Sequence, residues 1–224
     1  MQELYNRLHK FDLDYAIKLE ETDRQFIALK ELINKQSEKK VALALVVANS
    51  IICYQLSGTW ENYWEEFSSY FSDKKISYEN IVSQLSEFIK QSKNNKRFID
   101  TKIKRLEKVN VALEILQDNE EYFYNHMTEL RDLLSKTMKQ KITDKTIVFA
   151  VKMFGYVARN IFSFVAYQKE IFIPIDSRLI NLFEKYKWEY TDINKFYLDL
   201  SEKLDIPLLH LDWIVLINYD ELMK

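Results

Sequence analysis

The chain has 224 residues, and its 32 Lys and Arg against 34 Asp and Glu give a formal net charge of −2 at pH 7. That balance argues against a generally basic nucleic-acid binder, although local patches rather than totals decide binding. Hydrophobic residues make up 47% of the chain, enough for a large core, but only two Gly and two Pro are present. So few turn residues disfavour a hairpin-rich sheet and exclude a Gly-rich phosphate loop.

The single cysteine, Cys53, excludes a disulfide framework and fits a reducing compartment. The histidines lie far apart without ligand partners at metal spacing, so we expect no bound metal. The apolar run 41–54 is shorter than the roughly 20 residues that span a bilayer, and the run 147–167 contains charged residues. The charged N-terminus has no apolar signal core. We therefore expect a cytoplasmic protein without a membrane segment.

Apolar residues recur at helical spacing along nearly the whole chain, and we expect an all-α fold of about ten helices without a strand. The expected helical segments are residues 4–15, 26–33, 41–54, 60–71 and 81–89, a basic segment within 90–108, a region closing at 129–138 and the apolar segment after 143–144. The segment 41–54 is apolar all round, so we expect it to be a central helix. Thr59 or Gly58 marks the start of 60–71. Later helix starts are marked by Asp176 or Ser177, Thr191 or Asp192, and Pro207. The length suits one large domain or two small helical lobes sharing a cleft, with residues 92–97 as a short joint.

Lys145 falls in the first turn of the helix that follows Thr143 and Asp144. A cation there opposes the positive end of the helix dipole by about 0.3–1 kcal/mol, so stability alone favours Asp or Glu. Partial burial at a cleft would lower the pKa of this amine, and a deprotonated lysine is a nucleophile suited to Schiff-base chemistry. A solvated surface lysine is the alternative. Lys152 is a rival nucleophile, but it lies mid-helix and we expect it to extend to solvent.

Three further features have both a structural and a functional interpretation. Asp176, in the extended break IPIDSRLI, either caps a helix or stabilises the oxocarbenium-like transition state of glycosidic cleavage. The aromatic ridge that includes Trp60 and Trp64 either packs in the core or stacks on an extruded base. The basic stretch 92–108 is either a solvated face or a phosphate-binding stripe, and a second basic cluster, 136–141, precedes Lys145.

Five stretches of this sequence together resemble one family, the archaeal 8-oxoguanine DNA glycosylases (AGOG), a divergent branch of the helix-hairpin-helix glycosylases. The matching stretches are YQLSGTWENYWEEFSSYF (54–71), SKNNKRFIDTKIKRL (92–106), DKTIVFAVKMFGY (144–156), IPIDSR (173–178) and PLLHLDW (207–213). The resemblance implies one glycosylase domain over residues 1–224, with two helical lobes around a cleft and the chain interleaved between them. It also implies a monomer that acts on damaged DNA at the nucleoid without a cofactor.

By this resemblance, the chain is a bifunctional N-glycosylase and AP lyase that excises 8-oxoguanine in base excision repair. Lys145 is the implied nucleophile and Asp176 the catalytic carboxylate. The residues implied to contact the flipped base are Gln25, Cys53, Trp64, Phe149, Pro174, Asp212 and Leu216, with Trp64 and Phe149 stacking on it. The residues expected to hold the DNA backbone are Lys93, Lys96, Arg97 and Lys141.

The sequence departs from the family pattern at two of these positions. Cys53 stands where the family tends to have a serine, and Leu216 where a second pocket tryptophan is expected. The glycine-rich hairpin of the wider superfamily is also missing, since KQKITDK (139–145) contains no glycine. The alternatives are therefore a glycosylase for another base lesion, a non-catalytic helical DNA-binding module, and a helical protein-interaction domain.

Overall fold

The computed structural model describes all residues, 1–224, which form 14 α-helices and no strand. The all-α prediction is confirmed, although periodicity indicated only about ten helices. In chain order the helices are α1 (Gln2–Leu8), α2 (Leu13–Glu21), α3 (Arg24–Lys35), α4 (Lys39–Ile52), α5 (Trp60–Phe71), α6 (Ile81–Gln91), α7 (Ile99–Leu116), α8 (Glu120–Asn125), α9 (Met127–Met138), α10 (Lys145–Ala158), α11 (Ser177–Tyr186), α12 (Ile193–Leu204), α13 (Leu208–Ile217) and α14 (Tyr219–Leu222).

The additional helices arise at breaks that the apolar periodicity does not reveal. Asp12 accepts a hydrogen bond from the backbone N–H of Tyr15 at 2.8 Å and so begins α2, which splits the first apolar stripe in two. His126 separates α8 from α9, and Asn218 separates α13 from α14. None of these three capping residues is Gly or Pro, the residues that most often mark a boundary in a sequence.

Side-chain caps show where several helices begin whose first residue is ambiguous in the sequence. Thr59, Asp176 and Asp192 each accept backbone N–H groups in the first turns of α5, α11 and α12. Such a cap contributes about 1 kcal/mol. Asp144 precedes α10 but does not cap it with its side chain, and the carboxylate instead accepts the backbone N–H of Lys141 at 3.1 Å. The first turn of α10 therefore lacks a side-chain cap.

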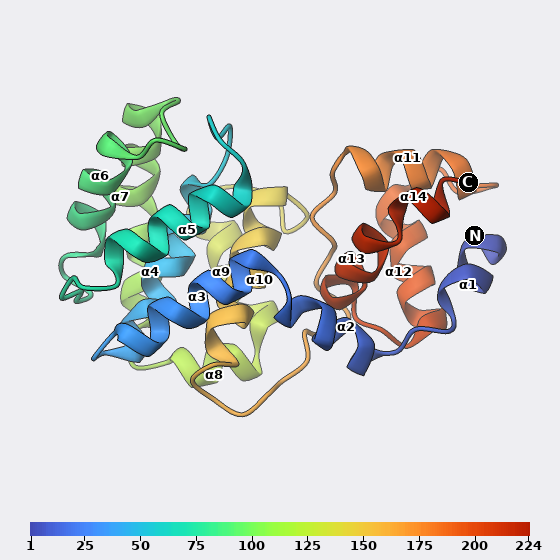
Figure 1. The fold of residues 1–224 in the computed structure, drawn as a ribbon, viewed down its shortest axis with the longest axis horizontal. Coiled ribbons are helices and arrows are strands. Elements are labelled where there is room, and N and C mark those ends of the chain that lie inside the picture. The colour runs from blue at the N-terminus through green and yellow to red at the C-terminus, as the bar shows by residue number, and fades with distance from the viewer. The chain divides into compact units, whose positions relative to one another are not determined.

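The chain folds into two compact units, visible in Figure 1, which are described separately. Unit 1 combines the two ends of the chain, Met1–Thr22 and Ala166–Lys224, and unit 2 is the continuous segment Asp23–Val165. The blue and red ends of the ribbon thus belong to the same unit. No helix has the combination of length and apolarity that crossing a bilayer requires.

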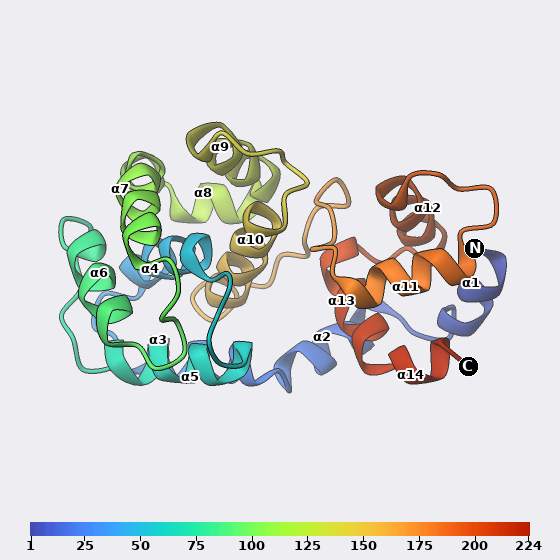
Figure 2. The same ribbon diagram turned by 90° about the horizontal axis from the view of Figure 1, so that it is seen from above.

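Unit 2 is built around α4, the helix that the sequence predicts to be central. Its residues from Ala42 to Ile52 are all buried, and it packs against α10, which is buried from Ile147 to Ala158. Helices α3 and α5 pack together, as do α7 and α9 (Figure 2). The expectation that Lys152 extends to solvent is wrong: only 7% of this residue is exposed, because it lies in the buried middle of α10.

Unit 1 joins α1 and α2 to the four last helices through a shared apolar core. Helix α2 packs against α13, and α1 against α12. Between α2 and α13, His210 Nδ1 lies 2.8 Å from Glu20 Oε1, and both side chains are buried. This polar contact and the surrounding core connect residues 190 positions apart.

Candidate active site

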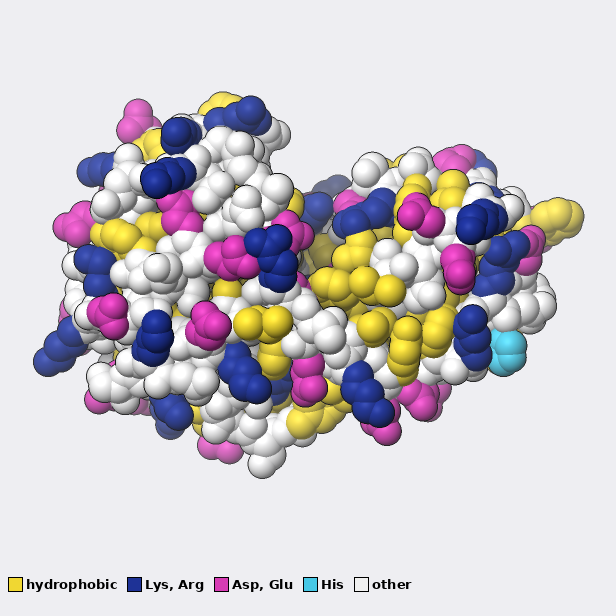
Figure 3. Space-filling view, viewed as in Figure 1, with side chains coloured by type: hydrophobic (Ala, Val, Ile, Leu, Met, Phe, Trp, Pro, Cys, Tyr) yellow, Lys and Arg dark blue, Asp and Glu magenta, His cyan; other side chains and the backbone are white.

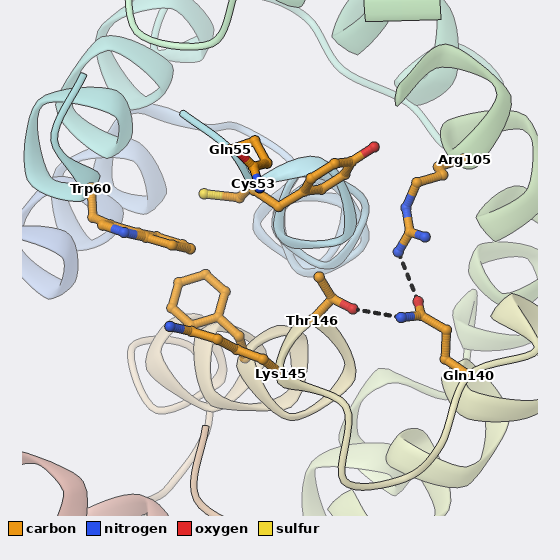
Figure 4. Close-up of a pocket in the computed structure, with 9 residues that line it drawn as sticks. Cys53, Gln55, Trp60, Arg105, Gln140, Lys145 and Thr146 are labelled. Atoms are coloured by element: carbon orange, nitrogen blue, oxygen red, sulfur yellow. Dashed lines mark hydrogen bonds between the residues drawn. The ribbon is translucent and has the colours of Figure 1, made fainter. Parts of the chain in front are cut away.

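Unit 2 contains a pocket of about 420 Å³ at the N-terminal end of α10 (Figure 4). It is lined by Cys53, Tyr54, Gln55, Trp60, Arg105, Gln140, Lys145, Thr146 and Phe149. These residues come from the end of α4 and the segment after it, the start of α5, the middle of α7, and the segment before α10 together with its first two turns. Segments far apart in the sequence therefore form one site.

Lys145 is the first residue of α10 and lines this pocket. Its Nζ lies 5.6 Å from the centroid of the Trp60 ring, and Figure 4 shows the two side chains on the same side of the pocket. The residue is exposed rather than partly buried as expected. The structure thus places the amine against an aromatic face at the positive end of a helix, within reach of a bound molecule.

Aromatic rings form the wall beside Lys145. The ring of Phe149 meets Trp60 edge-on, with centroids 5.0 Å apart, and it lies 6.2 Å from Trp64 at an interplanar angle of 53°. Trp64 is fully buried, so Trp60 is the tryptophan that lines the pocket. A base stacked between two rings needs parallel planes about 7 Å apart, which is twice the stacking distance of about 3.4 Å. Phe149 and Trp64 do not form such an open slot in this structure.

A chain of hydrogen bonds forms the opposite wall of the pocket (Figure 4). Arg105 donates to Gln140 Oε1 at 2.8 Å, and Gln140 Nε2 donates to Thr146 Oγ1 at 3.0 Å. The guanidinium also donates to the carbonyl of Ile51 and lies 5.4 Å from the centroid of Tyr54. Partial burial lowers the pKa of Arg105 from its usual value, but the group keeps its charge at neutral pH. A fixed cation at the pocket rim suits an anionic group of a ligand.

Of the base-contacting residues implied by the resemblance, Cys53 and Phe149 line the pocket together with Lys145. Burial raises the pKa of the Cys53 thiol well above its usual range, so the group stays neutral. Gln25 lies half-buried in the first turn of α3, also in unit 2, but does not line this pocket.

The predicted catalytic carboxylate and the remaining residues predicted to contact the base belong to unit 1. Asp176 caps α11 with one oxygen, which accepts the N–H of Arg178 at 2.9 Å, and its other oxygen accepts the Arg178 guanidinium at 2.7 Å. Pro174 is buried two residues before Asp176. Asp212 and Leu216 are half-buried one turn apart on α13, so they share a helix face.

The basic stretch 92–108 divides into two parts. Lys93, Lys96 and Arg97 are exposed in the loop before α7, and Lys141 is exposed before α10. Lys102, by contrast, is fully buried and donates to Asn95 Oδ1. The stretch is therefore not uniformly exposed: Lys93, Lys96 and Arg97 face solvent, whereas Lys102 does not. On the face in Figure 3, Lys and Arg are interspersed with Asp and Glu, which fits the net charge of −2.

Burial of Lys102 has a consequence for the pH dependence of stability. Desolvation lowers the pKa of its amine from 10.5 to about 8 in the folded chain. Between these values the unfolded chain binds more protons, so this residue makes folding more favourable as the pH rises from about 8 to 10.5. We expect Lys102→Met to lose that gain, up to about 3 kcal/mol. Urea unfolding of wild type and Lys102→Met at pH 7.5 and pH 10 measures this gain. If the two proteins differ in free energy of unfolding by the same amount at both pH values, this account is contradicted.

Sequence reasoning missed several pocket residues. Trp60 was recognised only as part of an aromatic ridge, and its position at the first residue of α5 gives it access to the pocket. Arg105 is in the sequence only one of several cations in a basic stretch. Tyr54 and Gln140 are not distinguished from their neighbours in the sequence, because their role depends on the packing of α4, α7 and the segment before α10.

A lysine amine beside aromatic rings in a pocket is the arrangement that an enzyme needs for Schiff-base chemistry on a nucleotide whose base has been extruded, as in a DNA glycosylase with lyase activity. The profile of one family, AGOG, described as N-glycosylase/DNA lyase, matches residues 5–221. The chain belongs to this family, which confirms the resemblance seen in its motifs, and it is by that membership an N-glycosylase/DNA lyase.

Relatives from several archaea support this assignment. The N-glycosylase/DNA lyase of Methanococcus maripaludis is 41% identical over 221 residues, which cover 96% of this chain and 86% of the relative. That of Thermococcus kodakarensis is 40% identical over 211 residues, 92% of this chain and 79% of the relative. A similar fold is seen in the crystal structure of Pa-AGOG, the 8-oxoguanine DNA glycosylase of Pyrobaculum aerophilum, complexed with 8-oxoguanosine. Superposition of the two structures gives a TM-score of 0.80 at 22% sequence identity, and the matched region covers 97% of this chain and 86% of Pa-AGOG.

Proposed function

We propose that this N-glycosylase/DNA lyase excises 8-oxoguanine from DNA, with Lys145 as its nucleophile. The observation that carries the proposal is the position of Lys145 at an aromatic-walled pocket on the first turn of α10. The solved structure of similar fold is that of an 8-oxoguanine DNA glycosylase in complex with 8-oxoguanosine, which supports the choice of lesion. A monomer with one glycosylase domain made of both units suffices for this function.

The proposed reaction uses the neutral form of the Lys145 amine at C1′ of the sugar. The Lys145 nitrogen bonds to C1′ as the bond from C1′ to the base breaks, and the base leaves with the proton that the nitrogen gives up. The Schiff base that forms when the sugar ring opens allows removal of a C2′ proton and expulsion of the 3′ phosphate, which nicks the strand. Asp176 stabilises the positive charge that develops on the sugar.

The lesion enters the pocket as a flipped nucleotide and stacks on Phe149. The proposed partner ring is Trp64, which requires Phe149 to rotate, because the two centroids are 6.2 Å apart at 53°. Gln25, Cys53, Pro174, Asp212 and Leu216 are the proposed contacts to the edge of the base. Lys93, Lys96, Arg97 and Lys141 are the proposed contacts to the DNA backbone, and their exposure leaves them free to reach phosphates.

A panel of lesion oligonucleotides tests the substrate. Duplexes carrying 8-oxoguanine, uracil or an alkylated purine are incubated with the protein and resolved on a denaturing gel without alkali. We expect strand cleavage of the 8-oxoguanine duplex at least about tenfold faster than of the others, because a pocket built to pair with polar groups rejects bases that lack them. Faster cleavage at another lesion would reassign the substrate, and binding without cleavage would favour a DNA-binding module.

A further inference from the structure

Phe98 is an exposed aromatic residue held in an unfavourable backbone conformation. It occupies the N-cap position of α7 with φ 58° and ψ 37°, the left-handed region that bulky side chains avoid. Its side chain does not gain from burial either, since 58% of the residue is exposed. Neither the local backbone nor the core therefore explains why a phenylalanine occupies this position. Strained residues that expose a side chain in this way cluster at binding and catalytic sites.

The loop that presents Phe98 is fixed on one side by the carboxylate of Glu66. That carboxylate accepts hydrogen bonds from Ser92 Oγ at 2.9 Å, the backbone N–H of Lys93 at 2.6 Å and Asn94 Nδ2 at 2.8 Å. Such charge-assisted bonds are stronger than neutral ones. The exposed phenylalanine thus follows a segment that several hydrogen bonds tie to α5.

On its other side, the same loop is joined to the segment that lines the pocket. The carbonyl of Asn94 accepts the backbone N–H groups of Ser57 and Gly58 at 2.8 and 3.2 Å, and Asn95 Nδ2 donates to the carbonyl of Ile52 at 3.4 Å. A Cβ atom on Gly58 would lie 2.0 Å from Asn94 Oδ1, so glycine permits this close approach. Cys53, Tyr54 and Gln55, which line the pocket, lie between these anchoring residues.

Helix α7 provides a second link between Phe98 and the pocket. Phe98 directly precedes the first residue of α7, and Lys102 and Arg105 follow it on the helix by four and seven residues. The Lys102 Nζ lies 4.7 Å from the centroid of Tyr54, and Arg105 lines the pocket itself. At 1.5 Å per residue, Phe98 is about 10 Å from Arg105 along the helix axis, roughly three base-pair steps.

The residues around Phe98 determine what it meets. Lys93, Lys96 and Arg97 are exposed next to it, and Asp100 is the nearest acidic residue in the chain. An apolar ring among cations suits duplex DNA, whose phosphates the cations would contact and whose bases the ring would stack on. Proteins that kink or open DNA insert apolar side chains between bases in this way.

We propose that Phe98 is a wedge that enters the base stack of duplex DNA where the damaged nucleotide has left it. The ring replaces the stacking that the duplex loses on extrusion, and the cations on the same loop hold the adjacent phosphates. This proposal rests on the proposed function, since it needs a nucleotide to be flipped into the pocket. Phe98 is a positioning residue: it does not touch the reacting sugar.

The test compares two substrates that differ only in whether a stack must be opened. Single-turnover excision of 8-oxoguanine is measured in a duplex and in a single strand, for wild type, Phe98→Ala and Phe98→Asn. Asparagine tolerates the left-handed backbone, so this variant keeps the loop while removing the ring. We expect both variants to lose about 5- to 150-fold on the duplex, the equivalent of 1–3 kcal/mol of stacking per base, and less than about twofold on the single strand.

A matched control lies on the same helix. Val111 is 56% exposed on α7, so Val111→Ala removes a comparable exposed apolar group away from the loop. We expect it to leave both rates unchanged, and Phe98→Trp to retain duplex activity because it keeps a stacking ring. Fluorescence of a 2-aminopurine placed beside the lesion reports unstacking directly, and both Phe98 variants without a ring should weaken this signal.

The outcomes separate this inference from the function it rests on. If wild type excises 8-oxoguanine from neither substrate, the proposed function fails and the wedge with it. If wild type is active and the variants cut the duplex as fast, only the wedge is overturned. An equal loss on both substrates would also overturn it, because the ring would then support the pocket and not the opening of the stack.

Discussion

Replacing Lys145 by glutamine is expected to abolish both strand cleavage and covalent trapping by borohydride on DNA that contains 8-oxoguanine. Borohydride reduces the Schiff base to a stable amine, so a crosslink reports the bond between a lysine nitrogen and the sugar. Glutamine keeps most of the side chain's length beside Trp60 but has no nucleophilic amine. We expect crosslinking and cleavage below about 1% of wild type, because no other group replaces a covalent nucleophile.

The control for this variant removes a neighbouring positive charge without touching the pocket. Lys136, exposed in the last turn of α9, belongs to the same basic cluster, and Lys136→Gln should crosslink as well as wild type. Full crosslinking by Lys145→Gln would show that another lysine is the nucleophile. Lys152 would be the first to examine, although its burial in α10 argues against access to a sugar.

Asp176→Asn is expected to lower the rate of excision by about 10²- to 10⁴-fold, the usual effect of removing a group that assists charge development and proton transfer. The loss should not come from unfolding. Asparagine caps helices about as well as aspartate, so the start of α11 should persist with a change of less than about 1 kcal/mol in stability. Single-turnover excision and thermal unfolding of the same preparation measure the two effects.

Asp192 offers a matched control for the cap. Its carboxylate accepts the N–H groups of Asn194 and Lys195 at 2.8 and 3.3 Å, the same cap that Asp176 makes at α11 apart from the ion pair of Asp176 with Arg178. Asp192→Asn should therefore change stability to the same small extent and leave the rate of excision unaltered. If Asp176→Asn is as active as Asp192→Asn, the carboxylate at 176 serves only as a helix cap.

The sequence predicted well those features that depend on neighbouring residues. The all-α fold, the central helix α4 and the caps at Thr59, Asp176 and Asp192 all follow from local periodicity and capping chemistry. The helix ends were harder to predict because the chain has only two glycines. Lys139 and Asp205 take the left-handed conformation at the ends of α9 and α12, where glycine is the usual residue.

Features set by long-range packing were not predictable in the same way. The basic residues of 92–108 look equivalent in the sequence, yet Lys102 is buried, Arg105 lines the pocket and Lys96 is exposed. Which face of α7 turns inward depends on the segment after α4. The two tryptophans of α5 were likewise indistinguishable until the packing of α10 buried Trp64 behind Phe149 and left Trp60 at the pocket.

The division of the chain also orders the events of its synthesis. Unit 2 is one continuous segment, so the ribosome releases everything that the lysine pocket needs once residue 165 has emerged. Unit 1 has to wait, because α2 packs against α13 and their contact joins Glu20 to His210. Domains generally fold as units as they emerge. The unit with the amine is therefore assembled first, and the unit with the carboxylate is completed only after α13 has emerged.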